Sequence, residues 1–134
     1  GQFMAPWKMD AIVQKIESTD NKNILLTERG TTFGYESLVT DVRSISIMQK
    51  TGYPVIFDAT HSAQIPGKIG GITGGMRDYI PVLAYAATAA GCNGIFLEVH
   101  DNVNEAKSDA ATQWPLDKLS NLLTTLKQIY QATK

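Results

Sequence analysis

The chain has little cysteine and little excess charge, and both shortages exclude classes of protein. Cys92 is the one cysteine among 134 residues, so an internal disulfide framework is excluded and a reducing compartment, the cytoplasm, is expected. The 13 acidic and 12 basic residues leave a net charge of −1, which offers no electrostatic attraction to nucleic acid or to an anionic membrane surface. No basic segment followed by a long apolar run opens the chain, so no signal peptide and no membrane partner are predicted.

The residues that are present indicate one globular α/β unit. Hydrophobic residues make up 43% of the chain and charged residues 19%, which is typical of a globular protein. A length of 134 residues allows one domain at most. Because the sequence starts without methionine and as if inside a strand, we expect it to be part of something longer.

Four strand–helix pairs are predicted, since short apolar runs alternate with helical patterns. The expected strands are residues 2–6, 24–26, 54–57 and 94–97, and the expected helices are 9–16, 38–48, 77–90 and 115–129. This alternation favours parallel strands with right-handed crossovers. A four-stranded open sheet fits, and so does half of a TIM (β/α)₈ barrel, which needs about 250 residues. Because an open fragment leaves two apolar edges uncovered, we favour residues 1–134 as a single half-barrel segment of a larger (β/α)₈ domain.

Polar residues follow the apolar runs at the points where the strands end. His61 comes soon after the run 54–57, Glu98 directly follows 94–97, and Asp109 lies in the next loop. The carboxyl ends of parallel strands share one rim, where TIM-barrel sites lie, so these three side chains could bind a divalent metal ion through nitrogen and oxygen. The alternative is two solvated loop acids beside a hydrogen-bonded rim histidine.

Arg29 follows a predicted strand and precedes Gly30. A guanidinium fork binds a carboxylate or phosphate with two hydrogen bonds, and glycine lets a ligand approach the backbone. The alternative is a structural salt bridge to a neighbouring acid, such as Glu28. The glycine-rich stretch 67–75 lacks the Gly-Lys-Ser/Thr of a P-loop, and a lid or an interface loop is the favoured interpretation.

Four blocks of the sequence match a known enzyme family. They are residues 1–7 (GQFMAPW), 27–35 (TERGTTFGY), 57–62 (FDATHS) and 106–113 (AKSDAATQ). In order along the whole chain, they resemble the second half of 3-deoxy-manno-octulosonate-8-phosphate synthase, also called 2-dehydro-3-deoxyphosphooctonate aldolase. The resemblance implies a TIM barrel, usually a homotetramer. It also implies a transferase of lipopolysaccharide (KDO) biosynthesis that condenses phosphoenolpyruvate with arabinose 5-phosphate and water, releasing phosphate.

The resemblance also implies roles for individual residues. Arg29 and His61 would bind phosphoenolpyruvate, and His61, Glu98 and Asp109 would bind a divalent metal ion of the zinc, iron or manganese class. Catalytic roles are expected for His61, Arg29 and Asp109. Residues 108–113 resemble the metal-dependent branch, whose fourth ligand is a cysteine that would lie outside this chain and that Cys92 does not match. A lysine that binds phosphoenolpyruvate and the sugar-phosphate segment would also lie outside it, so this segment alone is expected to be inactive.

One departure and two alternatives accompany the resemblance. Residues 100–103 (HDNV) replace the histidine-proline start of the family's loop, which affects the expected conformation of that loop. The related heptulosonate-phosphate synthase shares the Glu-Arg-Gly and Asp…His features, but the run TTFGY argues against it. The other alternative is a non-catalytic half-barrel that binds a phosphorylated ligand or only assembles.

Overall fold

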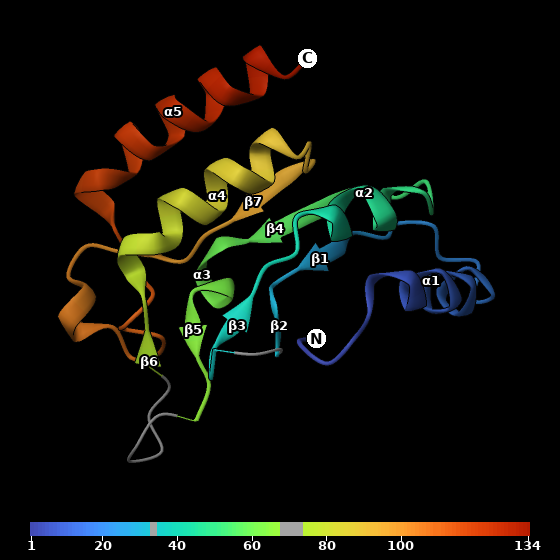
Figure 1. Cartoon of the computed structure of the whole chain (residues 1–134), viewed down its shortest axis with the longest axis horizontal. Coiled ribbons are helices and arrows are strands. Elements are labelled where there is room, and N and C mark those ends of the chain that lie inside the picture. Colours follow the sequence, from blue (N-terminus) through green and yellow to red (C-terminus); the bar gives the residue numbers. More distant parts are fainter. Residues whose placement is uncertain (33–34, 68–73) are drawn as a thin grey trace.

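A sheet of three parallel strands carries the fold (Figure 1). The computed structural model describes residues 1–32, 35–67 and 74–134. In the sheet, β4 (Val55–Asp58) lies between β1 (Leu26–Glu28) and β7 (Gly94–Phe96). Both neighbours of β4 run parallel to it, with Thr27 opposite Ile56 and Ile56 opposite Gly94. The predicted mixed α/β class with parallel strands is therefore confirmed.

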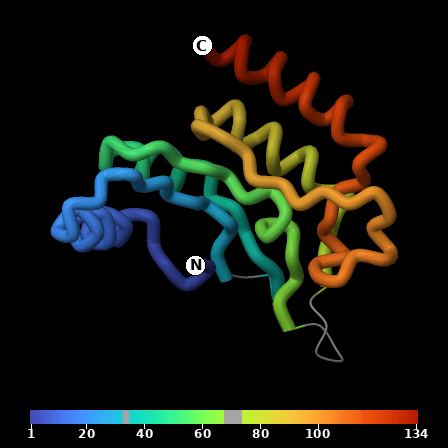
Figure 2. The backbone as a smooth tube through the Cα atoms, turned by 180° about the vertical axis from the view of Figure 1, so that it is seen from behind, coloured from blue at the N-terminus to red at the C-terminus, as the bar shows by residue number. Residues whose placement is uncertain are grey.

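Helices follow each strand of this sheet, and short two-stranded pairs lie beyond its carboxyl end. The helices are α1 (Met9–Glu17), α2 (Arg43–Gln49), α3 (Ala59–Ser62), α4 (Ile80–Ala89) and α5 (Leu119–Ala132), with 3₁₀ turns η1 (Pro6–Lys8), η2 (Arg77–Tyr79), η3 (Val103–Glu105) and η4 (Leu116–Lys118). The antiparallel pairs are β2 (Thr31–Thr32) with β3 (Leu38–Val39) and β5 (Gln64–Ile65) with β6 (Gly74–Gly75), and β8 (Val99–His100) pairs in parallel with β9 (Trp114–Pro115). Helix α5 lies along α4, at the far side from α1, in both views (Figures 1 and 2).

The core forms on one face of the sheet because apolar residues occupy alternate strand positions. Leu26, Val55 and Phe57 are buried there against the helices. The helices contribute Val13 from α1, Ile45 and Met48 from α2, Ile80 and Ala84 from α4, and Leu122 and Leu126 from α5. On the other face, Phe96 is 45% exposed and Thr27 is exposed too. At the carboxyl end of this second face, His61 of α3 stacks on Phe96.

Three expectations about the elements are wrong. Residues 2–6 form no strand: the chain begins with a turn in which the Met4 amide donates to the Gly1 carbonyl, and η1 begins at Pro6. The parallel sheet of the described part therefore has three strands, where four were expected. Leu38 lies in β3, because α2 begins only at Arg43, whose amide donates to the Asp41 carboxylate.

The third correction concerns the last helix, which begins at Leu119, since Pro115 belongs to β9 and caps η4. Expectations for residues 33–34 and 68–73, the lid interpretation included, lie outside the described residues. Among the helices of the described ranges, none has the length and apolar character needed to cross a membrane.

Candidate metal and anion site

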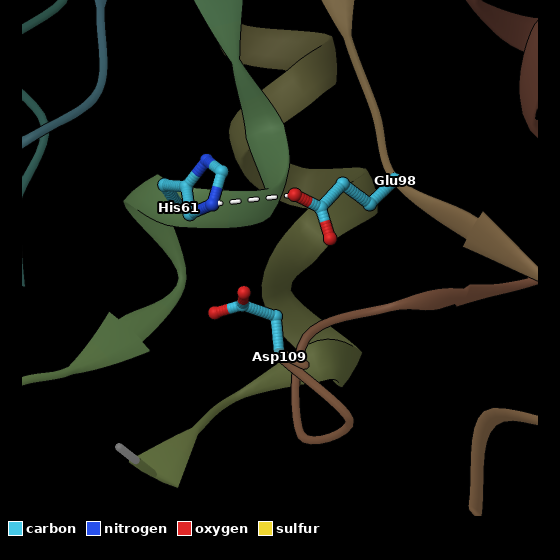
Figure 3. A group of neighbouring side chains, drawn as sticks. All are labelled: His61, Glu98 and Asp109. Atoms are coloured by element: carbon cyan, nitrogen blue, oxygen red, sulfur yellow. Dashed lines mark ion pairs between the residues drawn. The ribbon is translucent and has the colours of Figure 1, made fainter. Parts of the chain in front are cut away.

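Three side chains from separate segments meet at the carboxyl end of the sheet. His61 lies in α3, which follows β4 directly, Glu98 lies between β7 and β8, and Asp109 lies in the loop before β9. Their side chains point toward one another around a common space (Figure 3). One ligand atom from each lies within 4.8 Å of the others. The structure thus brings together the three residues that the sequence analysis selected, while their role as metal ligands stays a prediction.

Asp58 holds the His61 imidazole in place. One Asp58 carboxylate oxygen accepts the His61 amide proton at 2.9 Å and caps α3, and the other lies 2.6 Å from His61 Nδ1. An ionised carboxylate only accepts hydrogen bonds, so Nδ1 carries the proton of a neutral ring and Nε2 keeps a free lone pair. That Nε2 lies 3.4 Å from Glu98 Oε1, and the ring stacks on Phe96 with centroids 5.9 Å apart.

Glu98 is held in the same way by a buried amide. Gln113 Nε2 donates to Glu98 Oε2 at 2.9 Å, and the Glu98 backbone amide donates to Thr60 Oγ1 at 2.8 Å. These bonds leave Oε1 directed at His61. Glu98 is therefore not a solvated loop acid, since its side chain is 25% exposed and has a defined partner.

Asp109 sits at a tight turn that directs its carboxylate inward. Its φ of +50° is in the left-handed region, which aspartate tolerates better than most residues. Its carbonyl accepts from the Thr112 and Gln113 amides at 2.8 and 2.9 Å, and its carboxylate accepts from Gln64 Nε2. Arg77 also donates to the Ala110 carbonyl. The loop conformation is thus fixed by several bonds around the carboxylate.

Gly75 of β6 packs closely against the loop that carries Asp109. An added Cβ would lie 3.1 Å from the Ala111 Cβ and would overlap the Thr112 methyl group. Thr112 is 1% exposed and bonded to Asp109, so it cannot move aside. We expect Gly75→Ala to lower the free energy of unfolding by about 1–3 kcal/mol through overpacking, measured by urea denaturation of the polypeptide that carries residues 1–134. Gly1→Ala, which meets nothing within 4 Å, is the control. An unchanged urea midpoint for Gly75→Ala would contradict this close packing of Gly75 against the loop.

Arg29 lies at the end of β1 with its guanidinium bonded to two amide oxygens. It donates to Gln2 Oε1 at 2.6 Å and to Gln64 Oε1 at 3.0 Å. The expected alternative, a salt bridge to a neighbouring acid such as Glu28, is not formed within the described part of the chain. Glu28 instead accepts from the Gly30 amide at 2.6 Å and from the Ser44 hydroxyl of α2. Arg29 therefore keeps its positive charge beside neutral partners, with further N–H groups available to an anion.

The amide side chains that hold the site could not be found from the sequence. Gln64 and Gln113 carry no motif of their own, and only their distances to Arg29, Asp109 and Glu98 reveal them. Cys92 is not among the clustered residues and lies buried before β7, where it is 6% exposed. Burial raises the pKa of the Cys92 thiol above its usual range.

Comparison with known proteins assigns the chain to a family. The family model described as the DAHP synthetase I family matches residues 1–134. The chain belongs to this family. The 2-dehydro-3-deoxyphosphooctonate aldolase of Protochlamydia amoebophila (strain UWE25) is 54% identical over 131 residues, which make up 98% of this chain and 48% of the relative.

Two further members of the family carry the same name. They come from Xanthomonas campestris pv. campestris (strain B100) and Xanthomonas oryzae pv. oryzae (strain PXO99A), and each is 51% identical over 134 residues, which make up 100% of this chain and 49% of the relative. The chain thus spans about half the length of the curated relatives it matches. The names of these relatives confirm the resemblance that the four sequence blocks predict.

Proposed function

We propose that residues 1–134 form half of a (β/α)₈ barrel in a synthase that condenses phosphoenolpyruvate with arabinose 5-phosphate and water. The products are 3-deoxy-manno-octulosonate 8-phosphate and phosphate, for lipopolysaccharide (KDO) biosynthesis. The names of the curated relatives support this substrate pair. Strand order β1-β4-β7 follows chain order, as in a barrel. The observation that carries the proposal is the cluster of His61, Glu98 and Asp109 at the carboxyl end of the sheet.

The cluster fits a divalent metal ion of the zinc, iron or manganese class. His61 Nε2 and Glu98 Oε1 lie 3.4 Å apart, and two ligands about 2.1 Å from a tetrahedral ion are separated by roughly 3.4 Å. Glu98 and Asp109 each place a carboxylate oxygen within 4.8 Å of the other, and two carboxylates at such a distance repel each other without a counter-charge. We propose His61, Glu98 and Asp109 as the ligands within this chain. When bound, the ion would polarise a substrate oxygen or orient a water molecule.

Arg29 would bind the carboxylate or phosphate of phosphoenolpyruvate, with His61 near the phosphate. Gln2 and Gln64 hold the guanidinium in one orientation before the substrate arrives, so its free N–H groups are pre-organised for the anion. In the proposed reaction, the methylene carbon of phosphoenolpyruvate attacks the aldehyde carbon of the sugar. Water then adds to the next carbon, and the bond from that carbon to the phosphate oxygen breaks. Arg29 stabilises the charge that shifts during these steps.

Phosphate release tests this proposal. In the complete synthase proposed to contain residues 1–134, we expect phosphate release from phosphoenolpyruvate with arabinose 5-phosphate. With other sugar phosphates we expect less. A chelator should abolish the activity, and added Zn²⁺, Fe²⁺ or Mn²⁺ should restore it. Full activity in chelator would remove the metal ion from the proposal. No phosphate release with any sugar phosphate would favour the non-catalytic alternative, and turnover by residues 1–134 alone would show that no further half-barrel is needed.

A homotetramer in the cytoplasm is part of the same proposal. Helix α5 and its η4 turn expose Leu116 and Leu123, which are 53% and 52% exposed, and apolar residues of this kind suit a contact between subunits. Light scattering of the purified protein measures the assembly. A monomeric mass would contradict this part alone.

Asp58→Asn should weaken metal binding by about 10- to 100-fold. Outer partners of ligating histidines contribute that much to metal affinity, because they select the ring tautomer that His61 needs. Asparagine caps helices as well as aspartate does, so α3 should remain intact. Zinc affinity measured by calorimetry gives the result. The control is Asp101→Asn, at a second His–Asp pair whose acid is 82% exposed, and equal losses in the two variants would contradict the role of Asp58.

A further inference from the structure

One side chain joins the two parts of the candidate site. Gln64, in β5 just after α3, accepts a hydrogen bond from the Arg29 guanidinium at 3.0 Å through Oε1. Its Nε2 donates to the Asp109 carboxylate. The orientation of this amide is unambiguous, since a guanidinium can only donate and an ionised carboxylate can only accept. Gln64 is therefore the direct link between the anion-binding arginine and one candidate metal ligand.

We propose that Gln64 is a positioning residue that couples anion binding at Arg29 to cation binding at Asp109. The inference rests on the proposed function, in which phosphoenolpyruvate binds Arg29 and the metal ion binds the cluster. An anion on Arg29 further stabilises the guanidinium orientation that bonds Gln64, and the Gln64 amide in turn stabilises the Asp109 carboxylate in the orientation that binds a cation. Both ligands therefore favour the same arrangement of Arg29, Gln64 and Asp109, so the second ligand binds more tightly. The coupling is reciprocal, since each ligand must strengthen the other by the same factor.

Direct attraction between the anion and the cation would also couple the two sites, and substitutions at Gln64 separate the two causes. Methionine is similar in length but offers no strong donor or acceptor, so Gln64→Met removes both hydrogen bonds and leaves the direct attraction. Glutamate keeps the acceptor for Arg29, loses the donor to Asp109 and adds a negative charge. Gln64→Glu should therefore keep or strengthen metal binding while it weakens phosphoenolpyruvate binding, whereas damage to the fold would weaken both.

The experiment measures zinc affinity by calorimetry, with and without phosphoenolpyruvate, in the polypeptide that carries residues 1–134. In the unaltered protein, we expect phosphoenolpyruvate to tighten zinc binding by about fivefold or more. In Gln64→Met this ratio should fall several-fold toward 1. The matched control is Gln128→Met on the exposed side of α5, which should keep the original ratio.

The outcomes separate this inference from the proposed function. Normal zinc and phosphoenolpyruvate binding with an unchanged ratio in Gln64→Met would overturn the coupling role alone. Equal weakening of both ligands in Gln64→Glu would also overturn it, since a purely structural role predicts that result. Failure of the unaltered protein to bind either ligand would overturn the proposed function, and the inference with it. A reduced ratio in Gln64→Met would support it, together with metal binding that is kept or strengthened and phosphoenolpyruvate binding that is weakened in Gln64→Glu.

Discussion

Replacing Arg29 by lysine should lower kcat/KM for phosphoenolpyruvate by about a hundredfold or more. The guanidinium serves Gln2 and Gln64 at the same time and still has N–H groups for a substrate. A lysine ammonium keeps the charge but cannot present a planar fork to three partners. Loss of one pre-organised donor to developing charge typically costs 10²–10³ in rate. Steady-state phosphate release at varied phosphoenolpyruvate concentration measures the effect.

Arg43→Lys is the matched control for this substitution. Arg43 bonds the Asp41 carboxylate at 2.8 Å, with 82% of its own side chain exposed. This arginine holds the pKa of Asp41 below its usual range through those hydrogen bonds, but an exposed pair contributes little to stability. We expect no change in kcat/KM. Equal kinetics for Arg29→Lys and the unaltered protein would remove Arg29 from the anion site.

The long elements could be predicted because their patterns are local. The apolar run before Asp58 was expected at residues 54–57, and β4 is Val55–Asp58. The two-residue strands could not be predicted, since each exists only through its partner. Leu38 has the helical spacing that precedes Val42 and Ile45, yet it pairs with Thr32 in a hairpin. Residues 2–6 have strand composition, but a turn and Pro6 end any extension there.

The residues of the candidate site also fall into those that could be predicted from the sequence and those that could not. His61 and Glu98 could be selected because each follows an apolar run at a strand end, and Asp109 because it lies in the loop after the last of these runs. The glutamines that bond to these residues could not be selected, because the role of an amide side chain depends on neighbours that are distant in the sequence. Gln64 is 45 residues from Asp109 in the chain, and Gln113 is 15 residues from Glu98. No spacing rule connects such pairs, so only the folded positions identify them.

Replacing Glu98 by glutamine should weaken zinc binding by at least about a hundredfold, which is more than loss of an outer partner costs. The amide is nearly the same size, and its oxygen can still accept from Gln113 Nε2, which lies 2.9 Å from Glu98 Oε2. The amide NH₂ of the new glutamine then faces His61 Nε2 in place of Glu98 Oε1. A metal ion would therefore find a hydrogen-bond donor at the position of a ligand oxygen. Calorimetric titration with Zn²⁺ measures the loss. Glu105→Gln, at an exposed acid of η3, is the control.

Thermal unfolding of Glu98→Gln also tests whether Glu98 is a metal ligand. Without metal, this substitution should not destabilise the protein, although it weakens zinc binding. Without metal, the carboxylates of Glu98 and Asp109 lie near each other in the cluster and repel, so removing one charge should keep or raise the melting temperature. With zinc at a hundred times its Kd, the free energy of unfolding of the unaltered protein should rise by about 2.7 kcal/mol. That of the variant should hardly change. A variant that is merely misfolded would melt lower in both conditions. If zinc raised the melting temperature of Glu98→Gln as much as that of the unaltered protein, Glu98 would not be a ligand.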